Sequence, residues 1–345
     1  MQEGDEMELT ERKNRILRSV VEHYIVTGEP LGSKQLCGSL NVSSATVRNE
    51  MSDLSEIGLL EQTHTSSGRI PSDRGYRYYI EHLMADAGLS RSDRFAIRSA
   101  FTDITSEPAA ILRKAVQYLA ELSDCACVAT TPFDENATIR HIELVPIGDR
   151  SALVIVVVST GTIKTGLCRL EEKPDLRTAE VFYRICATAF QDKRANDVSL
   201  SRLQTIASGL GDRMLSILPL LFSVAELANQ ASKPEVLSAG QENLLRHPEL
   251  EVDKFALYDF LQDPHMLIRY LQSGHNDMTI RIGSEIGVQA LRHTSILRSQ
   301  YKVNDRPFGC IAVLGPTRMN YPGIIPTLAY LCRIIGEMFR ENTAL

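Results

Sequence analysis

The sequence has no long hydrophobic run, no apolar leader segment and no paired cysteine motif. Its longest apolar run, residues 152–158, is far too short to cross a bilayer. Residues 1–10 are acidic and contain no apolar stretch, so we expect no signal peptide. These absences exclude the membrane and secreted classes and predict a cytoplasmic protein.

The seven cysteines are scattered along the chain, and no two have the CxxC spacing of a metal or redox site. An odd number without a secretory signal predicts reduced thiols in a cytosol. Cys125 and Cys127 share one face of a predicted strand, and no histidine lies close to them in sequence. We interpret both as small buried side chains and expect no metal site and no cofactor.

No acidic, histidine or nucleophilic residues have the spacing of a catalytic motif, so we predict that the protein is not an enzyme. Two observations keep alternatives open. Cys310 and His293 lie on predicted strands, where a thiol–imidazole pair would need only suitable geometry. Arg318 follows the turn at Gly315 and Pro316, where it either holds an anion with the turn amides or pairs with a neighbouring side chain. The second interpretation is favoured, because Gly-Pro turns are common without a ligand.

Positive charge is also in short supply. The 37 Lys and Arg residues face 43 Asp and Glu residues, which gives a net charge of −6. A basic surface is the usual mark of a nucleic-acid partner, so the total charge argues against a protein that coats nucleic acid. The 345 residues are enough for two or three domains with sizeable cores.

The N-terminal residues predict three short helices joined by tight turns. Between residues 16 and 25 the apolar positions follow a helical period, and Thr10 is suited to cap that helix. A short helix over residues 33–40 follows, and a third helix begins at Ser43 and ends before Gly58. This spacing predicts a helix-turn-helix.

A β-hairpin is predicted directly after the third helix. Two short extended arms, residues 59–63 and 69–71, flank a polar tip at residues 64–68. A hairpin in this position is the wing of a winged helix, so the N-terminal region is predicted to be a winged helix-turn-helix domain.

The rest of the chain predicts an α+β multidomain protein. Strand patterns come first, about a hundred mainly helical residues follow, and strand patterns then return before a closing helix near residues 324–339. The strands expected before the helical residues lie at 125–130, 139–147, 152–159 and 163–170, and those after them at 278–282, 293–302 and 309–314. We expect an antiparallel meander in the first group and a single sheet domain interrupted by a helical insertion.

These patterns give a set of domain bounds. The predicted divisions are a disordered lead at 1–8, the winged helix-turn-helix domain at 9–85, a linker at 86–106, the first part of the sheet domain at 107–170, the inserted helical domain at 171–275 and the second part of the sheet domain at 276–345.

The third helix carries polar residues where a DNA-reading helix needs them. Its apolar stripe lies at positions 47, 51 and 54, so Arg48, Asn49 and Ser52 point away from the core. Recognition helices read base edges with their N-terminal residues, and Arg suits guanine while Asn suits adenine. For any single residue, solvated surface is the simpler interpretation. The expected DNA contacts are Ser33, Lys34, Ser43, Ser44, Thr46, Arg48, Asn49, Ser52, His64, Thr65, Ser66, Ser67 and Arg69.

Charge within residues 9–85 is balanced, with nine cations and nine anions. A neutral DNA-binding domain has weak non-specific attraction to DNA, because that attraction comes from phosphate neutralisation. Its affinity is then left to base contacts and to the pairing of two half-sites.

Six segments form a specific combination of short motifs. They are GEPLGS at 28–33, SATVRNEMSDL at 44–54, HTSSGRIP at 64–71, GYRYY at 75–79, IGSE at 282–285 and GPTRM at 315–319. Together they resemble the HrcA family of heat-inducible transcription repressors, and the resemblance covers nearly the whole chain. Ser67 stands where the family usually has Ala, and Ile286 replaces the commoner Asn.

The resemblance implies a winged helix, a GAF-like antiparallel-sheet domain and an inserted helical dimerisation domain. It further implies a homodimer that binds double-stranded DNA at an inverted-repeat operator upstream of chaperone operons. Heat stress would release the repressor, and the chaperonin GroEL would help it reach its active fold. The alternatives are a metabolite-responsive repressor with an effector pocket in the GAF-like domain, and an enzyme that uses Cys310 and Arg318.

Overall fold

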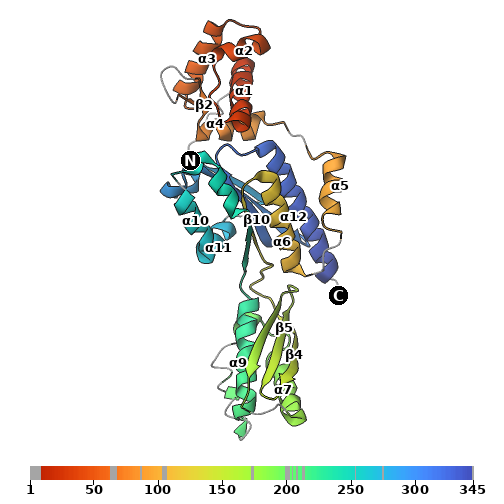
Figure 1. The fold of residues 1–345 in the computed structure, drawn as a ribbon. Helices are drawn as coiled ribbons and strands as arrows, with labels where there is room; N and C mark the ends of the chain where they lie inside the picture. The colour runs from red at the N-terminus through yellow and green to blue at the C-terminus, as the bar shows by residue number, and fades with distance from the viewer. Residues whose placement is uncertain are drawn as a thin grey trace, which may run out of the picture.

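The computed structural model shows an elongated molecule with three bodies along its length (Figure 1). It describes residues 9–62, 68–85, 88–102, 107–171, 175–198, 203, 205–206, 209–211, 214–252, 254–273 and 276–343. The predicted lead at 1–8 lies outside the described residues. The protein has an α+β fold with antiparallel sheets, as predicted.

The first body, which we call the N-terminal unit, holds helices and a short hairpin. Its elements are α1 (Glu11–Thr27), α2 (Ser33–Leu40), α3 (Ser44–Glu56), β1 (Leu60–Glu61), β2 (Ile70–Pro71) and α4 (Asp73–Tyr78), which continues as a π-helical turn over Tyr79–Leu83. The two strands pair antiparallel, with Leu60 opposite Pro71. The three predicted helices and the base of the predicted hairpin are therefore present.

The predicted caps define the ends of these helices. Thr10 Oγ1 accepts a hydrogen bond from the Lys13 amide at 3.3 Å, and Ser43 Oγ accepts one from the Thr46 amide at 3.2 Å. These bonds satisfy amides that the first turn of a helix leaves without partners. Gly58 follows α3 with φ +77°, a backbone conformation in which glycine has no steric penalty.

The predicted linker contains a helix of its own, α5 (Arg91–Ser99). Ile97 is buried, and Arg98 donates a hydrogen bond to Glu337 at 3.0 Å. Glu337 belongs to the long C-terminal helix α12 (Tyr321–Thr343), so α5 rests on that helix rather than extending freely.

The central body is built on a five-stranded antiparallel sheet with the order β7-β3-β10-β9-β8. Its strands are β3 (Ala126–Thr130), β7 (Val236–Ala239), β8 (Met278–Ile282), β9 (Thr294–Val303) and β10 (Arg306–Pro316). Helices α6 (Pro108–Ser123) and α12 cover one face, and the other face carries α10 (Lys254–Gln262), α11 (Pro264–Gln272) and short 3₁₀ turns. Buried residues of the α6–α12 side continue into the core of the N-terminal unit as one apolar cluster.

The third body, the β4–β6 unit, has a separate sheet. A meander of β4 (Ile139–Gly148), β5 (Ser151–Val158) and β6 (Ile163–Arg169) packs against α7 (Leu176–Ala189) and α9 (Met214–Ala231). Alternate residues of β5 are buried, which is the pattern of a sheet with one covered face.

This arrangement differs from the expected division at two points. The meander is present in β4, β5 and β6, but the strand predicted at 125–130 is not part of it, because β3 pairs with β10 and β7 instead. Strands predicted for the first part of the sheet domain thus form a sheet of their own with helices predicted for the insertion. Conversely, α10 and α11, also predicted for the insertion, pack on the central sheet. Apolar periodicity reports which face of a strand is buried and does not report which strand lies beside it.

Helix α9 is long and apolar enough to cross a membrane by length and composition. Leu220, Leu221 and Val224 are fully buried in the core that α9 shares with the β4–β6 sheet. Packing on a sheet accounts for these buried residues, as it does for the core helices of globular proteins, whereas Leu215 and Phe222 of the same helix stay exposed.

Candidate nucleic-acid interface and its attachment

The starts of α2 and α3 come together at the outer end of the N-terminal unit. The Ser33 and Ser44 hydroxyls are hydrogen-bonded to each other at 3.0 Å, and the Ser43 hydroxyl contacts the Thr46 hydroxyl at 2.9 Å. Four of the predicted DNA contacts therefore share one small surface. Free amides and the helix dipole make the start of a helix favourable for anions.

Lys34, Arg48 and Asn49 are exposed beside these hydroxyls. Within the described part of the chain, none of these three side chains makes a hydrogen bond or an ion pair. Val47 and Met51 of the same helix are buried, which fixes the opposite face of α3 against the core. Ser52 is half-buried one turn further along. The sequence-based interpretation of α3, apolar on one side and polar on the other, is confirmed.

Two of the three acidic residues of α3 pair with cations of α1. Glu50 is only 8% exposed and accepts a hydrogen bond from Arg12 Nε at 2.9 Å. Asp53 pairs with Lys13 at 2.9 Å, and this contact raises the pKa of Lys13. The cations Lys34 and Arg48 have no such neighbours among the described residues. The surface at the helix starts is therefore more positive than the balanced count of nine and nine suggests.

Glu50 is a structural residue that the sequence analysis missed. Its position was visible, because residues 47, 50, 51 and 54 have the i, i+3, i+4, i+7 spacing of one helix face. A charged residue on an apolar stripe needs a partner in the core, and Arg12 supplies it.

The base of the hairpin is fixed to the helices. Arg69 exchanges two backbone hydrogen bonds with Leu31, both 3.0 Å, and its Nε donates to Ser55 Oγ at 3.0 Å. A side chain on Gly68 would place its Cβ 2.4 Å from the Leu31 carbonyl, so this close approach requires glycine. Arg69 is thus held beside α3. The other predicted hairpin contacts, His64, Thr65, Ser66 and Ser67, lie outside the described residues.

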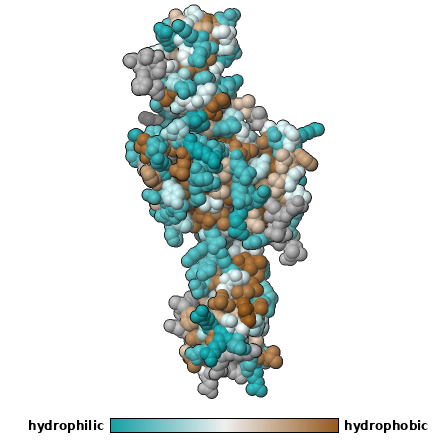
Figure 2. All heavy atoms as spheres, viewed as in Figure 1, coloured by the Kyte–Doolittle hydropathy of each residue, from teal (hydrophilic) through white to brown (hydrophobic). Residues whose placement is uncertain are grey.

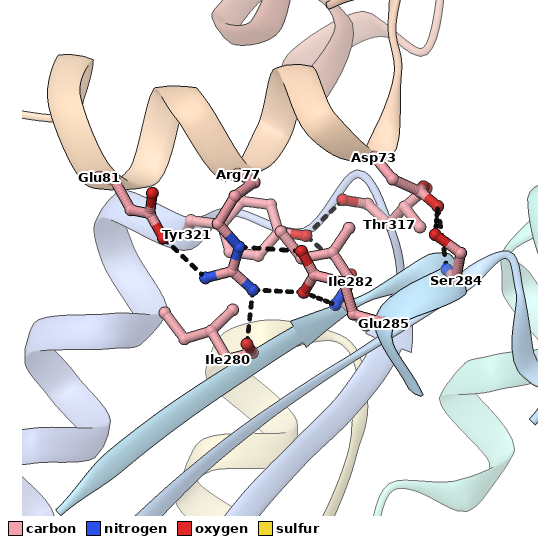
Figure 3. A network of polar contacts seen from close by, with 10 residues as sticks. Asp73, Arg77, Glu81, Ile280, Ile282, Ser284, Glu285, Thr317 and Tyr321 are labelled. Carbon is pink, nitrogen blue, oxygen red and sulfur yellow. Dashed lines mark hydrogen bonds and ion pairs between the residues drawn. The ribbon is translucent and has the colours of Figure 1, made fainter. Parts of the chain in front are cut away.

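The opposite side of the N-terminal unit rests on the central body through α4 (Figure 3). Asp73 accepts hydrogen bonds from the Ser284 amide at 2.9 Å and from the Ser284 hydroxyl at 3.1 Å. Arg77 donates to both carboxylate oxygens of Glu285, with its Nε at 3.0 Å, and to the Ile280 carbonyl at 2.6 Å. We call these five residues the α4 contact.

The loop that contacts α4, residues Gly283–Ile286, allows Asp73 to approach its backbone closely. Gly283 has φ +52°, and a Cβ there would lie 2.1 Å from Asp73 Oδ2. Glu285 also accepts a hydrogen bond from the Ile282 amide at 3.0 Å, which orients its carboxylate toward Arg77. The hydrogen bond to Glu285 raises the pKa of Arg77, so the guanidinium stays charged at any physiological pH.

Arg318 makes a second attachment. It forms an ion pair with Glu249 and donates to the Ile25 carbonyl at 3.2 Å, near the end of α1. Gly28, in the left-handed conformation with φ +70°, lies directly beside the guanidinium. The favoured sequence-based interpretation, in which Arg318 pairs with a neighbouring side chain, is confirmed.

The motifs at 282–285 and 315–319 therefore share a role that the sequence analysis did not assign. Both lie in the central body, and both hold the N-terminal unit. Tyr321, just after the second motif, adds a ring contact with Tyr76 at a centroid distance of 5.8 Å.

Cys310, whose thiol kept an enzyme open as an alternative, is buried, and so is Cys125. Cys310 is hydrogen-bonded with Thr130 and donates to the Leu271 carbonyl, each at 3.6 Å, and burial raises the pKa of its thiol. Burial also raises the pKa of Cys125 to about 12. These thiols are protonated at neutral pH, whereas a nucleophilic cysteine must be a thiolate. In the described ranges, no group of three or more metal-ligating side chains comes together.

Comparison with known proteins relates nearly the whole chain to one group. Residues 109–325 match the family model of the HrcA protein C-terminal domain. The heat-inducible transcription repressor HrcA of Acetivibrio thermocellus is 31% identical over 333 residues, which cover 94% of this chain and 95% of the relative. That of Clostridium perfringens (strain ATCC 13124) is 33% identical over 342 residues, covering 97% and 100%.

A crystal structure described as a hypothetical protein, at 2.2 Å resolution, has the same fold. Its TM-score is 0.74 with 24% sequence identity, and the match covers 97% of this chain and 99% of that one.

Proposed function

Because the chain belongs to the HrcA family of heat-inducible transcription repressors, we propose that it represses chaperone operons by binding their DNA directly. The N-terminal unit is the DNA-binding domain, a winged helix-turn-helix in which α3 enters the major groove. The observation that carries this proposal is the surface at the starts of α2 and α3. Its exposed cations have no partners among the described residues, while Glu50 and Asp53 nearby are paired inside the unit.

Each side chain on this surface has chemistry that suits DNA. Arg48 and Asn49 lie near the N-terminal end of α3, where they reach base edges, and a good bidentate pair is worth about 1–3 kcal/mol of discrimination. Ser33, Ser43 and Ser44, with the amides of the first turn, suit phosphate oxygens. Lys34 of α2 adds a phosphate contact. Thr46 and Ser52 lie on α3 with Arg48 and Asn49.

The hairpin serves as the wing. Arg69 lies at its base, and the sequence predicts the polar residues His64, Thr65, Ser66 and Ser67 for its tip. Small hydrogen-bonding groups with a cation suit a minor groove or a phosphate backbone beside the major-groove contact of α3. The hydrogen bond from Arg69 to Ser55 supports this role, because it fixes the wing relative to the reading helix.

We propose that the active species is a homodimer on an inverted-repeat operator, joined through the β4–β6 unit. Ile163 and Leu167 of β6 are 55% and 62% exposed, and Leu215 of α9 is also exposed. Figure 2 shows apolar residues at the surface of this lower part of the molecule. Exposed apolar area of this kind is typical of an interface. A two-fold dimer would present two reading helices to the two half-sites of a palindrome.

The central body is the GAF-like domain in this proposal, and its five-stranded antiparallel sheet with helices on both faces supports that assignment.

Heat would release the repressor by loosening the dimer or the attachment of the N-terminal unit. Three separate bodies expose apolar surface until they dock, which gives GroEL a substrate for assisted folding. We expect the protein to act in the cytoplasm, where its DNA lies.

Footprinting on the promoter of a chaperonin operon tests the proposal. We expect protection of an inverted repeat at 25 °C, loss of protection on heating, and stronger protection when GroEL is added. A promoter fragment with one scrambled half-site is the matched control, and it should be protected weakly or not at all. Equal protection of both fragments, or of neither, would refute sequence-specific repression.

A further inference from the structure

The central body buries an arginine whose guanidinium is only partly satisfied by the described residues. Arg298 of β9 is only 4% exposed, and its Nε and Nη1 atoms are buried without a hydrogen-bond acceptor among the described residues. Buried charges in proteins are almost always paired, because removing a guanidinium from water without compensation is strongly unfavourable. An arginine buried in this way therefore indicates an acceptor that comes from outside the chain.

A second buried polar group lies near this arginine. The hydroxyl of Tyr270 on α11 is buried and has no acceptor for its proton among the described residues, while Arg281 of β8 lies over the ring at 5.2 Å and interacts with the hydroxyl. Burial raises the pKa of Tyr270, while the charges of Arg281 and Arg298 oppose that rise. The hydroxyl and both guanidinium groups are therefore close enough to interact.

Strand register places the same groups on one face of the sheet. Arg298 lies opposite Thr279 of β8 and Ala312 of β10, both with small side chains. Ala312 and Cys310 belong to the core beneath α10 and α11, so Arg298 faces the side of the sheet that these helices cover. The positive charge of Arg298 also acts on Cys310. It lowers the pKa of the thiol and so opposes the raising effect of burial.

The described residues do not balance the positive charge at this place. The acid that acts on Tyr270 is Glu285, and its carboxylate is already engaged by Arg77 and by the Ile282 amide. Two arginines thus converge on a buried hydroxyl, and the nearby carboxylate is occupied in the α4 contact.

We propose that Arg298, Arg281 and the Tyr270 hydroxyl form a binding site for a small oxyanion of the carboxylate or phosphate type. The oxygens of such an anion accept hydrogen bonds from Nε and Nη1 of Arg298 and from the tyrosine hydroxyl, and Arg281 adds a second positive charge. This site is separate from the surface at the starts of α2 and α3 and does not depend on DNA binding.

Thermal unfolding of the full chain tests the site. Melting curves are recorded in sodium phosphate, in sodium acetate and in sodium chloride at constant ionic strength, so that the first two arms distinguish phosphate from carboxylate. We expect one of these oxyanions to raise Tm by about 2–4 °C at roughly ten times its Kd. The absence of a rise with both anions would overturn the proposal.

Arg298→Met separates the site from other anion effects. This variant should lose the response and should melt above the wild type in chloride, because methionine fills the space without an unpaired charge. The exposed residue Arg306 offers the control, since Arg306→Met should respond like the wild type. An unchanged response in Arg298→Met means that the anion binds elsewhere and contradicts the proposal.

Tyr270→Phe provides a test that does not disturb the buried arginine. Removing the hydroxyl alone should leave the fold intact and weaken the apparent Kd for the anion by about tenfold, as expected for one hydrogen bond to a charged acceptor. This variant decides the question if Arg298→Met does not fold, because an unchanged Kd would remove Tyr270 from the site and refute it as proposed.

Discussion

Arg48 and Arg77 are arginines on short helices of the same unit, yet their surroundings are opposite. Arg48 is exposed on α3 and has no partner among the described residues. Arg77 on α4 donates to Glu285 and to the Ile280 carbonyl, on the side that meets the central body. The outer face, which carries Lys34 and Arg48, therefore leaves its cations without partners among the described residues, and we call it the available face. The face of α4 with Asp73 and Arg77 holds the unit on the central body, and we call it the attached face.

This difference changes the meaning of the local charge count. A balance of nine cations and nine anions describes both faces together. In the structure, Glu50 and Asp53 are paired with α1, and Asp73 is bonded to Ser284. These three acids are engaged in contacts within the unit or with the central body, whereas Lys34 and Arg48 of the outer face have no partners among the described residues. A neutral unit can thus present a positive surface in one direction.

The largest effect is expected from a change at Gly283, in the loop of the central body that contacts Asp73 of the attached face. Gly283→Ala introduces a Cβ that would collide with Asp73 and strains a backbone with φ +52°. We expect the free energy of unfolding to fall by about 2–3 kcal/mol, measured by urea unfolding.

Gly287→Ala is the matched control, because Gly287 has φ +75° and nothing within 4 Å of an added Cβ. It should cost about 1 kcal/mol, from backbone strain alone. Equal losses in the two variants would show that the contact between Asp73 and Ser284 contributes nothing to stability.

Local features of both faces could be predicted from the sequence. The caps at Thr10 and Ser43, the glycine after α3 and the polar face with Arg48 depend on residues within one or two helical turns of each other. Interactions over that range are encoded by spacing, so periodicity and capping rules find them.

Long-range features could not be predicted in the same way. Arg77 and Glu285 are 208 positions apart, and β3 pairs with β10 and β7 rather than with the next strand along the chain. Periodicity identifies a buried face but does not identify the neighbour. The motifs at 282–285 and 315–319 were noticed from the sequence, yet their role became clear only when the fold brought them to α4 and α1.

The second prediction tests the available face. Arg48→Ala should weaken operator binding by about 1–3 kcal/mol and relax base preference at one position of each half-site, because a bidentate base contact is lost. The stability of the protein should change by less than about 0.5 kcal/mol, since Arg48 supports no described contact. Gel-shift titration and urea unfolding measure the two quantities.

Arg18→Ala is suited as its control, because Arg18 is an exposed cation of the same unit on α1. It removes the same charge without removing a proposed base contact, so base preference should be retained. If operator affinity is unchanged in Arg48→Ala, Arg48 is not a reader.

The third prediction reverses the pattern on the attached face. Arg77→Ala should lower the free energy of unfolding by about 1–2 kcal/mol, because Glu285 and the Ile280 carbonyl lose their donor. Base preference of the folded protein should not change. Arg77→Lys keeps the charge but not the two-pronged geometry, and it should recover only part of the loss. A change in base preference would mean that the two faces are not separate in function.

The smallest effect is expected at Lys34, which tests whether the available face contacts phosphate as well as bases. Lys34→Ala removes one exposed cation at the start of α2 and leaves the reading helix intact. Operator affinity should fall slightly and equally for all sequences, and the slope of log K against log salt should decrease in magnitude by about 0.9 per half-site. Gel shifts at a series of salt concentrations measure that slope.

Arg77→Ala is the comparison from the attached face and should leave the salt slope unchanged, because Arg77 is turned toward the central body. A slope that is the same in wild type and Lys34→Ala would place Lys34 off the DNA, and the phosphate contacts would then rest on the serine hydroxyls and amides at the start of α3.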